Sequence, residues 1–262
     1  MGQARSRVVF LTSASPASSY FAAVLARSGR LAGIVYEKRT FRWRAEVLLR
    51  LLRRRGVLKV LDQIAYRAVE RVLAPRGHVR LEGEAYSTGP EDCQRISSVP
   101  QCRVSDINAQ EILDFIEPLA PDLLIVKSTS IIRGKLLERY SCRIFNFHAG
   151  ITPEYRGVHA PFWALFNGER GMVGATIHLV DRGIDTGGIL EQESVPVDPS
   201  VDSFFTIYVK LNRKGAELML RAIEKFESGS LLPFAKKGAT SRLYSFPGLT
   251  DYCRYVCRTR IR

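Results

Sequence analysis

The chain has 262 residues, of which 46% are hydrophobic and 25% charged, proportions that are ordinary for a globular protein with a buried core. Its 39 basic and 26 acidic residues give a net charge of +13, which indicates an anionic partner such as a phosphate, a nucleotide, a nucleic acid or an anionic membrane surface. No apolar run approaches the roughly 18 residues of a membrane span. The five cysteines lack regular spacing and no secretory signal precedes them, so we expect reduced thiols, no metal site and a cytoplasmic location.

The first 36 residues predict the opening of a parallel α/β sheet. Residues 7–12 are apolar and predict a buried strand, a serine-rich turn and a helical pattern follow, and residues 32–36 predict a second strand. The turn lacks both the glycine spacing of a dinucleotide-binding loop and a Walker lysine, so nothing indicates NAD or ATP.

A basic segment from about residue 38 to residue 80 interrupts this alternation. It carries 13 lysines and arginines against three acids, a local charge of +10. Apolar residues recur in it at three- and four-residue steps, which predicts one or two helices, and we expect most of these side chains to pack against the sheet. The arginines between them either bind an anion or form a solvated face.

The remaining elements continue the α/β pattern. We expect strands at residues 95–99, 123–126, 143–148, 174–180 and 189–197, and helices at residues 111–116, 134–140, 161–166 and 203–226. The expected fold is therefore α/β: a Rossmann-like, open and mainly parallel sheet with flanking helices, a basic helical insert and a short C-terminal extension. Residues 1–197 would form the α/β domain, with the insert at about 38–80, and residues 198–262 the C-terminal helix and extension.

Two polar residues, Asn146 and His148, stand in the otherwise apolar strand at residues 143–148. Side chains two positions apart on a strand point to one face, and ligands bind beyond the carboxyl ends of strands in open parallel sheets. Taken alone, this pair fits buried structural hydrogen bonds as well as it fits a catalytic site. Downstream, three glycines flank Asp185 within residues 183–190, which predicts a tight loop with a close backbone approach.

Taken together, these segments resemble the folate-dependent formyltransferase family, which includes glycinamide ribonucleotide, methionyl-tRNA and nucleotide-sugar formyltransferases. The family has an Asn-x-His pair on a strand, then a His-x-x-x-x-Pro-x-Tyr-Arg-Gly loop, then a Gly-x-Asp-x-Gly loop. Residues 146–148, 148–157 and 183–187 match these motifs in order, and the resemblance extends roughly from residue 105 to residue 197. Gly150 departs from the pattern, because the best-known members have serine there.

The resemblance implies transfer of a formyl group from 10-formyltetrahydrofolate to an amine, with Asn146, His148 and Asp185 as the catalytic residues. Asn146 would donate a hydrogen bond to the oxyanion of the tetrahedral intermediate, and a protonated His148 would add a charge-assisted one. Asp185 would raise the pKa of His148 and help to move the proton from the amine to the leaving folate nitrogen. This chemistry requires no metal.

The resemblance also implies binding residues. The residues expected to contact the folate are Ser130, Ile131, Ile132 and Asp185. Tyr155, Arg156 and His159 are candidates for contacting the acceptor, although bracing of the loop is an equal interpretation for Arg156 and a structural role is favoured for His159. We interpret His178, in the strand at residues 174–180, as a satisfied core or surface histidine.

The residues after His148 are most similar to nucleotide-sugar N-formyltransferases of the GDP-perosamine kind. The implied partners are therefore the folate and a nucleotide-linked amino sugar, in O-antigen biosynthesis, rather than a nucleic acid. About 65 residues follow Val197 and begin as one helix, so we expect no counterpart of the C-terminal β-barrel domain of methionyl-tRNA formyltransferases. The alternatives are a glycinamide ribonucleotide or aminoacyl-tRNA acceptor, a folate-linked hydrolase that releases formate, and a non-catalytic relative that binds a polyanion. A homodimer is left open.

Overall fold

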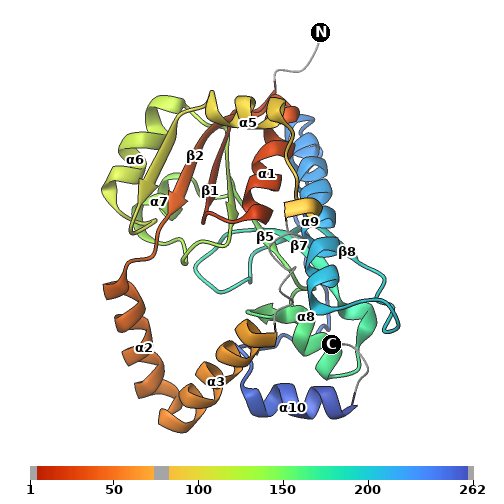
Figure 1. Cartoon of the computed structure of the whole chain (residues 1–262). Coiled ribbons are helices and arrows are strands. Elements are labelled where there is room, and N and C mark those ends of the chain that lie inside the picture. The colour runs from red at the N-terminus through yellow and green to blue at the C-terminus, as the bar shows by residue number, and fades with distance from the viewer. Residues whose placement is uncertain (1–4, 74–82, 259–262) are drawn as a thin grey trace.

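A computed structural model describes residues 5–73 and 83–258 and places a seven-stranded sheet at the centre of the molecule (Figure 1). The strand order is β3-β2-β1-β4-β5-β7-β8. The strands are β1 (Val8–Thr12), β2 (Leu31–Glu37), β3 (Gln101–Val104), β4 (Leu123–Lys127), β5 (Ile144–His148), β7 (Gly174–Leu179) and β8 (Ile189–Ser194). The five neighbouring strands β3, β2, β1, β4 and β5 run parallel to one another. In contrast, β7 is antiparallel to β5, and β8 is antiparallel to β7. The expected Rossmann-like, mainly parallel α/β fold is confirmed.

Helices cover both faces of the sheet (Figure 1). One face carries α1 (Pro16–Arg27), α9 (Phe204–Glu227) and, beside α1, α5 (Pro90–Ser97), and the other carries α6 (Gln110–Ile116) and α7 (Gly134–Arg139). Successive residues of β1 alternate between the two resulting cores, which explains why the central strands are apolar throughout. The domain boundary expected at residue 197 stays a prediction. The helix that follows it, α9, packs directly on the sheet through Ile207 and Leu211.

The strand expected at residues 95–99 is wrong, because residues 95–97 end α5 and residues 98 and 99 form the turn that follows. Pro90 occupies the first turn of α5, where its missing N–H is harmless, and Glu91 and Asp92 favour the positive end of the helix dipole. The Asp92 carboxylate also accepts a hydrogen bond from the Gly89 N–H at 3.3 Å. The strand forms only after Pro100, as β3.

The basic insert is a helical hairpin, α2 (Phe41–Arg55) and α3 (Val57–Leu73), joined at Gly56, whose φ of +78° suits glycine. It projects from one end of the sheet (Figure 1). The expectation that its apolar residues pack against the sheet is wrong, since α3 packs against α10 (Leu249–Arg258) instead. Lys59 Nζ lies 2.9 Å from an Asp251 oxygen across that contact. Helical periodicity predicted an apolar helix face but not the element that covers it. The end of the expected insert lies within residues 74–82, which are outside the described residues.

The C-terminal segment returns to the centre of the molecule. Its short strand β9 (Leu243–Tyr244) pairs with β6 (Arg156–Gly157), which precedes α8 (Ala160–Phe166). Across residues 5–73 and 83–258, the helices lack the combination of length and apolar character that crossing a membrane requires.

Candidate active site

The polar pair of β5 lies where the sheet changes from parallel to antiparallel pairing. Asn146 pairs with Val126 of β4 on one side and with His178 of β7 on the other. Directly opposed residues of neighbouring strands point to the same face, so Asn146 and His178 lie side by side, and His148 follows on the same face. All three line one cavity of about 670 Å³.

Asp185 reaches this cavity from the loop between β7 and β8. Its Oδ2 atom lies 3.4 Å from Nδ1 of His148, and its Oδ1 atom lies 3.4 Å from Nε2 of His178. The Gly157 N–H donates to Oδ2 at 2.8 Å. The φ of Asp185 is +51°, a left-handed conformation that aspartate tolerates better than most residues. The carboxylate is thus fixed between two imidazole rings.

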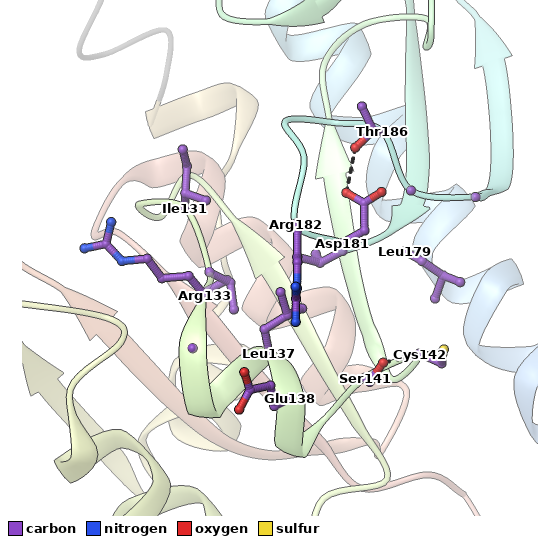
Figure 2. A pocket seen from close by; sticks show the side chains of 15 residues that line it. Ile131, Arg133, Leu137, Glu138, Ser141, Cys142, Leu179, Asp181, Arg182 and Thr186 are labelled. Carbon is purple, nitrogen blue, oxygen red and sulfur yellow. Dashed lines mark hydrogen bonds between the residues drawn. The ribbon is translucent and has the colours of Figure 1, made fainter.

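Close backbone packing holds the Asp185 loop. The Thr186 hydroxyl donates to Oδ1 of Asp181 at 2.7 Å (Figure 2). A Cβ atom at Gly187 would collide with the carbonyl oxygen of Leu179, so only glycine fits there. The close approach expected from the flanking glycines therefore occurs, and it is an approach of the loop to its own strand.

The surroundings of His148 define where its protons are. Its Nε2 atom lies 2.7 Å from the Tyr155 carbonyl oxygen, which can only accept, so Nε2 carries a hydrogen. Nδ1, which faces Asp185, is therefore the atom that gains or loses a proton. A Cβ atom at Gly150 would lie 2.5 Å from Nε2, so the glycine that departs from the family pattern leaves room for this ring.

His178 is a member of the site that the sequence did not reveal. Its side chain is 3% exposed, and its Nδ1 donates to the Leu179 carbonyl at 2.7 Å. Its Nε2 atom also contacts the Asn146 amide nitrogen, at 3.0 Å. This contact orients the amide and leaves its second N–H for a ligand.

The charges of the site differ from those expected. Burial lowers the pKa of His148 and outweighs Asp185 and the Tyr155 carbonyl, which act in the opposite direction. The expected effect of Asp185 is present, but it does not leave the net pKa of His148 raised. Burial also raises the pKa of Asp185, but His148, His178 and the Gly157 N–H together outweigh burial and lower it to about 2. Asp185 is accordingly ionised and His148 is neutral near neutral pH.

A second cavity, of about 810 Å³, adjoins the first (Figure 2). Ile131 and Ile132 line both cavities, and so do Val180 and Asp181. Ser130 and Asp185 line the first cavity only. The four residues expected to contact the folate thus lie around the joined cavities, whose volumes are in the range of sites for organic ligands.

The side chain of Tyr155 does not reach the cavity. It is fully buried, its ring stacks on Tyr244 at 5.2 Å, and its hydroxyl donates to Glu169 at 2.6 Å. Burial and Glu169 raise the pKa of this hydroxyl. Tyr155 therefore acts on the site through its carbonyl oxygen, which positions His148.

Arg156 and His159 also lie off the cavity wall. Arg156 donates from Nη1 to the Ile184 carbonyl at 3.0 Å, which is the bracing role. His159 packs edge-on against Phe246 at 4.2 Å, and burial, together with Arg67, lowers its pKa to about 4. The structure thus gives both residues structural contacts.

The opposite wall comes from segments that the motifs do not include. Leu51 and Arg55 of α2, Gln63 and Arg67 of α3, and residues 243–246 line the cavity across from Asn146. Within the part of the chain that the structure describes, no cluster of three or more His, Cys, Asp or Glu side chains is arranged to hold a metal ion.

Fold and site together define the formyl transferase class of α/β proteins. The family described as "Formyl transferase" matches residues 60–223, more than half of the chain, and the chain belongs to this family. It is 32% identical over 141 residues to a methionyl-tRNA formyltransferase of Thermodesulfovibrio yellowstonii, covering 53% of this chain and 45% of that protein. A methionyl-tRNA formyltransferase of Synechococcus is 36% identical over 124 residues, covering 47% and 38%. The chain thus spans less than half the length of these curated relatives.

Solved structures share the fold at low sequence identity. A glycinamide ribonucleotide transformylase of Symbiobacterium toebii superposes with a TM-score of 0.59 at 19% identity, covering 93% of this chain and 96% of that one. An uncharacterised protein of Mycobacterium tuberculosis, assigned by inference to the sugar N-formyltransferases, gives a TM-score of 0.54 at 20% identity, covering 91% and 75%.

Proposed function

We propose that this protein transfers the formyl group of 10-formyltetrahydrofolate to the amino group of a nucleotide-linked amino sugar. The observation that carries the proposal is the convergence of the Asn146 amide, the His148 imidazole and the Asp185 carboxylate on one cavity beside a second cavity of about 810 Å³. Family membership supports the same donor. The folate supplies an activated formyl group; the residues of this chain orient it and move the proton.

In this proposal, Asn146 donates a hydrogen bond to the formyl oxygen. One N–H of its amide is engaged by His178 at 3.0 Å, so the other is held toward the cavity. When an amine attacks the formyl carbon, negative charge develops on the formyl oxygen, and a pre-oriented donor stabilises that charge. Because the strand and His178 fix the amide before the reaction, little reorganisation is needed.

In this proposal, His148 transfers the proton and Asp185 stabilises the protonated imidazole. The attacking amine must lose a proton, and Nδ1 of a neutral His148 is a base whose other nitrogen is already committed to the Tyr155 carbonyl. The imidazolium formed on proton uptake lies 3.4 Å from Asp185, which stabilises it. The proton then passes to the leaving folate nitrogen. His148 thus starts neutral, in contrast to the protonated state expected from the resemblance.

The cationic wall supports an anionic acceptor. Arg55 and Arg67 line the cavity opposite Asn146, and guanidinium groups form strong, directional hydrogen bonds with phosphate oxygens. A nucleoside diphosphate sugar of the GDP-perosamine kind, as used in O-antigen biosynthesis, presents such phosphates, and we propose a cytoplasmic site of action because such sugars are made there.

The test is a direct one. The purified full chain is incubated with 10-formyltetrahydrofolate and, separately, with a GDP-linked 4-amino sugar, glycinamide ribonucleotide and methionyl-tRNA. Each acceptor is examined by mass spectrometry for the gain of one formyl group. The expected result is formylation of the amino sugar in preference to the others. Release of formate without formylation of any acceptor would identify a hydrolase instead, and formylation of another acceptor would correct the substrate.

A further inference from the structure

The α2–α3 hairpin has an apolar face that residues 5–73 and 83–258 leave exposed. In α3 one face packs against the C-terminal segment, where the Gln63 amide donates to the Phe246 carbonyl at 2.5 Å. The opposite face is also apolar: Leu58 is 84% exposed and Leu61 is 54% exposed. The exposed apolar residues of α3 are Val57, Leu58, Leu61 and Ile64. Their spacing of i, i+1, i+4 and i+7 places them along one side of the helix.

The neighbouring helix also exposes apolar residues and adds positive charge. Phe41 of α2 is 86% exposed and Leu49 is 55% exposed. Arg50, Arg53 and Arg54 are exposed on the same helix, and no ion pair among the described residues joins them to a carboxylate. Figure 1 shows α2 leaving the end of β2 and, together with α3, projecting beyond the sheet. Exposed leucines and unpaired arginines thus share one protruding element.

We infer that the α2–α3 hairpin docks on an anionic lipid bilayer. Helices with large exposed apolar residues beside arginines lie in the interfacial region of membranes, where the apolar side chains enter the acyl boundary and the cations meet anionic headgroups. A bilayer would contact both the exposed apolar side chains and the exposed arginines of the hairpin. A nucleic acid would neutralise the arginines but leave the leucines in water. A second copy of the chain would cover the leucines but bring two sets of unpaired arginines together in a protein of net charge +13.

Docking would also fix the orientation of the cavity relative to the bilayer surface. Leu51, Arg55, Gln63 and Arg67, on the inner side of the hairpin, line the catalytic cavity, while Leu58 and Leu61 face outward. The bilayer would therefore lie beside the cavity wall without filling the cavity. The interaction does not depend on the proposed formyl transfer, and Leu58, Leu61, Arg53 and Arg54 are absent from the cavity lining.

The test uses cosedimentation of the full chain with vesicles of phosphatidylcholine alone or of phosphatidylcholine and phosphatidylglycerol in equal parts. We expect binding to the mixed vesicles, weakened at 0.5 M salt. The double variant Arg53→Gln/Arg54→Gln should bind about thirtyfold more weakly, since each lost cation weakens binding about fivefold. Leu58→Asp/Leu61→Asp should lose binding by more than about tenfold. The matched control Arg95→Gln/Arg139→Gln removes the same charge from α5 and α7 and should bind normally.

Circular dichroism and formyl transfer to a water-soluble acceptor should be unchanged in all three double variants, which separates this inference from the proposed function. Equal binding to both vesicle types, or no binding to either, would overturn it. A mobility shift with RNA that depends on the arginines but not on the leucines would assign the surface to nucleic acid. A dimer in light scattering that becomes monomeric in Leu58→Asp/Leu61→Asp would assign it to a second copy of the chain.

Discussion

The amide nitrogen of Asn146 lies 3.0 Å from Nε2 of His178, across the pair of strands at which the sheet turns from parallel to antiparallel. His178 is itself fixed by its Nδ1 bond to the Leu179 carbonyl at 2.7 Å. A continuous set of hydrogen bonds therefore runs from the backbone of β7 to the amide proposed to meet the formyl oxygen. His178 is in these terms a positioning residue.

The first prediction tests this coupling by a double-mutant cycle. Asn146→Ala should lower kcat by about 10²–10³-fold, because the developing oxyanion loses its donor. His178→Ala should lower kcat by about 10–100-fold through misorientation of the amide, with little change in the KM for folate. Because both act through one hydrogen bond, the double variant should be no slower than Asn146→Ala. Losses that multiply would contradict a role of His178 through Asn146.

The second prediction concerns pH. Since burial lowers the pKa of His148 and Asp185 opposes this, Asp185→Asn should lower that pKa further. A neutral His148 that accepts the amine proton makes kcat/KM rise with pH through the His148 pKa. The acidic limb of the profile should therefore move to lower pH in Asp185→Asn, while the plateau rate falls. An acidic limb that stays in place, or moves upward, would show that His148 is not the base.

The third prediction concerns the acceptor. Arg55→Gln and Arg67→Gln should each raise the KM for a phosphate-bearing acceptor by about tenfold and leave the KM for folate unchanged, because charged hydrogen bonds to phosphate are lost. Arg53→Gln is the matched control, as its side chain lies outside the cavity on the same helix. Steady-state kinetics with each substrate varied in turn provide the measurement. An equal effect in Arg53→Gln would point to general surface charge rather than to the cavity.

The fourth prediction concerns stability. Arg30, directly before β2, and Glu227, at the end of α9, form a nearly buried pair at 2.7 Å, with side chains 11% and 9% exposed. The hydrogen bonds from Arg30, against the opposing effect of burial, lower the pKa of Glu227 to about 2. Glu227→Gln should reduce the free energy of unfolding by about 2 kcal/mol in urea titrations.

The pH dependence of that pair has a definite sign. The folded-state pKa lies below the ordinary glutamate value of 4.5, so its contribution is complete above that pH and is lost as pH falls toward about 2. Glu224→Gln is the control, because its side chain is 59% exposed and 3.9 Å from Arg30, and it should change stability by less than about 0.5 kcal/mol. Equal effects of the two variants would contradict the pairing.

The sequence predicted the sheet and the Asn146–His148–Asp185 set for definite reasons. Strands buried on both faces are apolar throughout, and three motifs in fixed order are a specific pattern. Segment 95–99 was misassigned because its β-branched residues outweighed the helix start at Pro90. The family assignment is confirmed, whereas the catalytic roles stay predictions.

Other features depend on contacts that no local pattern encodes. His178 joins the site only because β7 runs antiparallel to β5 and places it opposite Asn146, and strand pairing of this kind is not readable from one sequence. Tyr155 looked accessible within a turn-rich loop, yet its ring is covered by Tyr244, almost 90 residues later in the chain. The exposure of the leucines of α3 was not predicted either, because helical periodicity identifies an apolar face but not the element that packs against it.

The two sides of the cavity have different origins along the chain. Asn146, His148, His178 and Asp185 lie within residues 60–223, the region that matches the family, whereas Arg55 and residues 243–246 lie outside it. Because the inner strands β1 and β2 also lie before residue 60, the matched region completes its sheet only together with the segment that supplies Arg55. A substitution at Arg55 or in residues 243–246 can therefore change the cavity wall without altering the strands that hold Asn146 and His148.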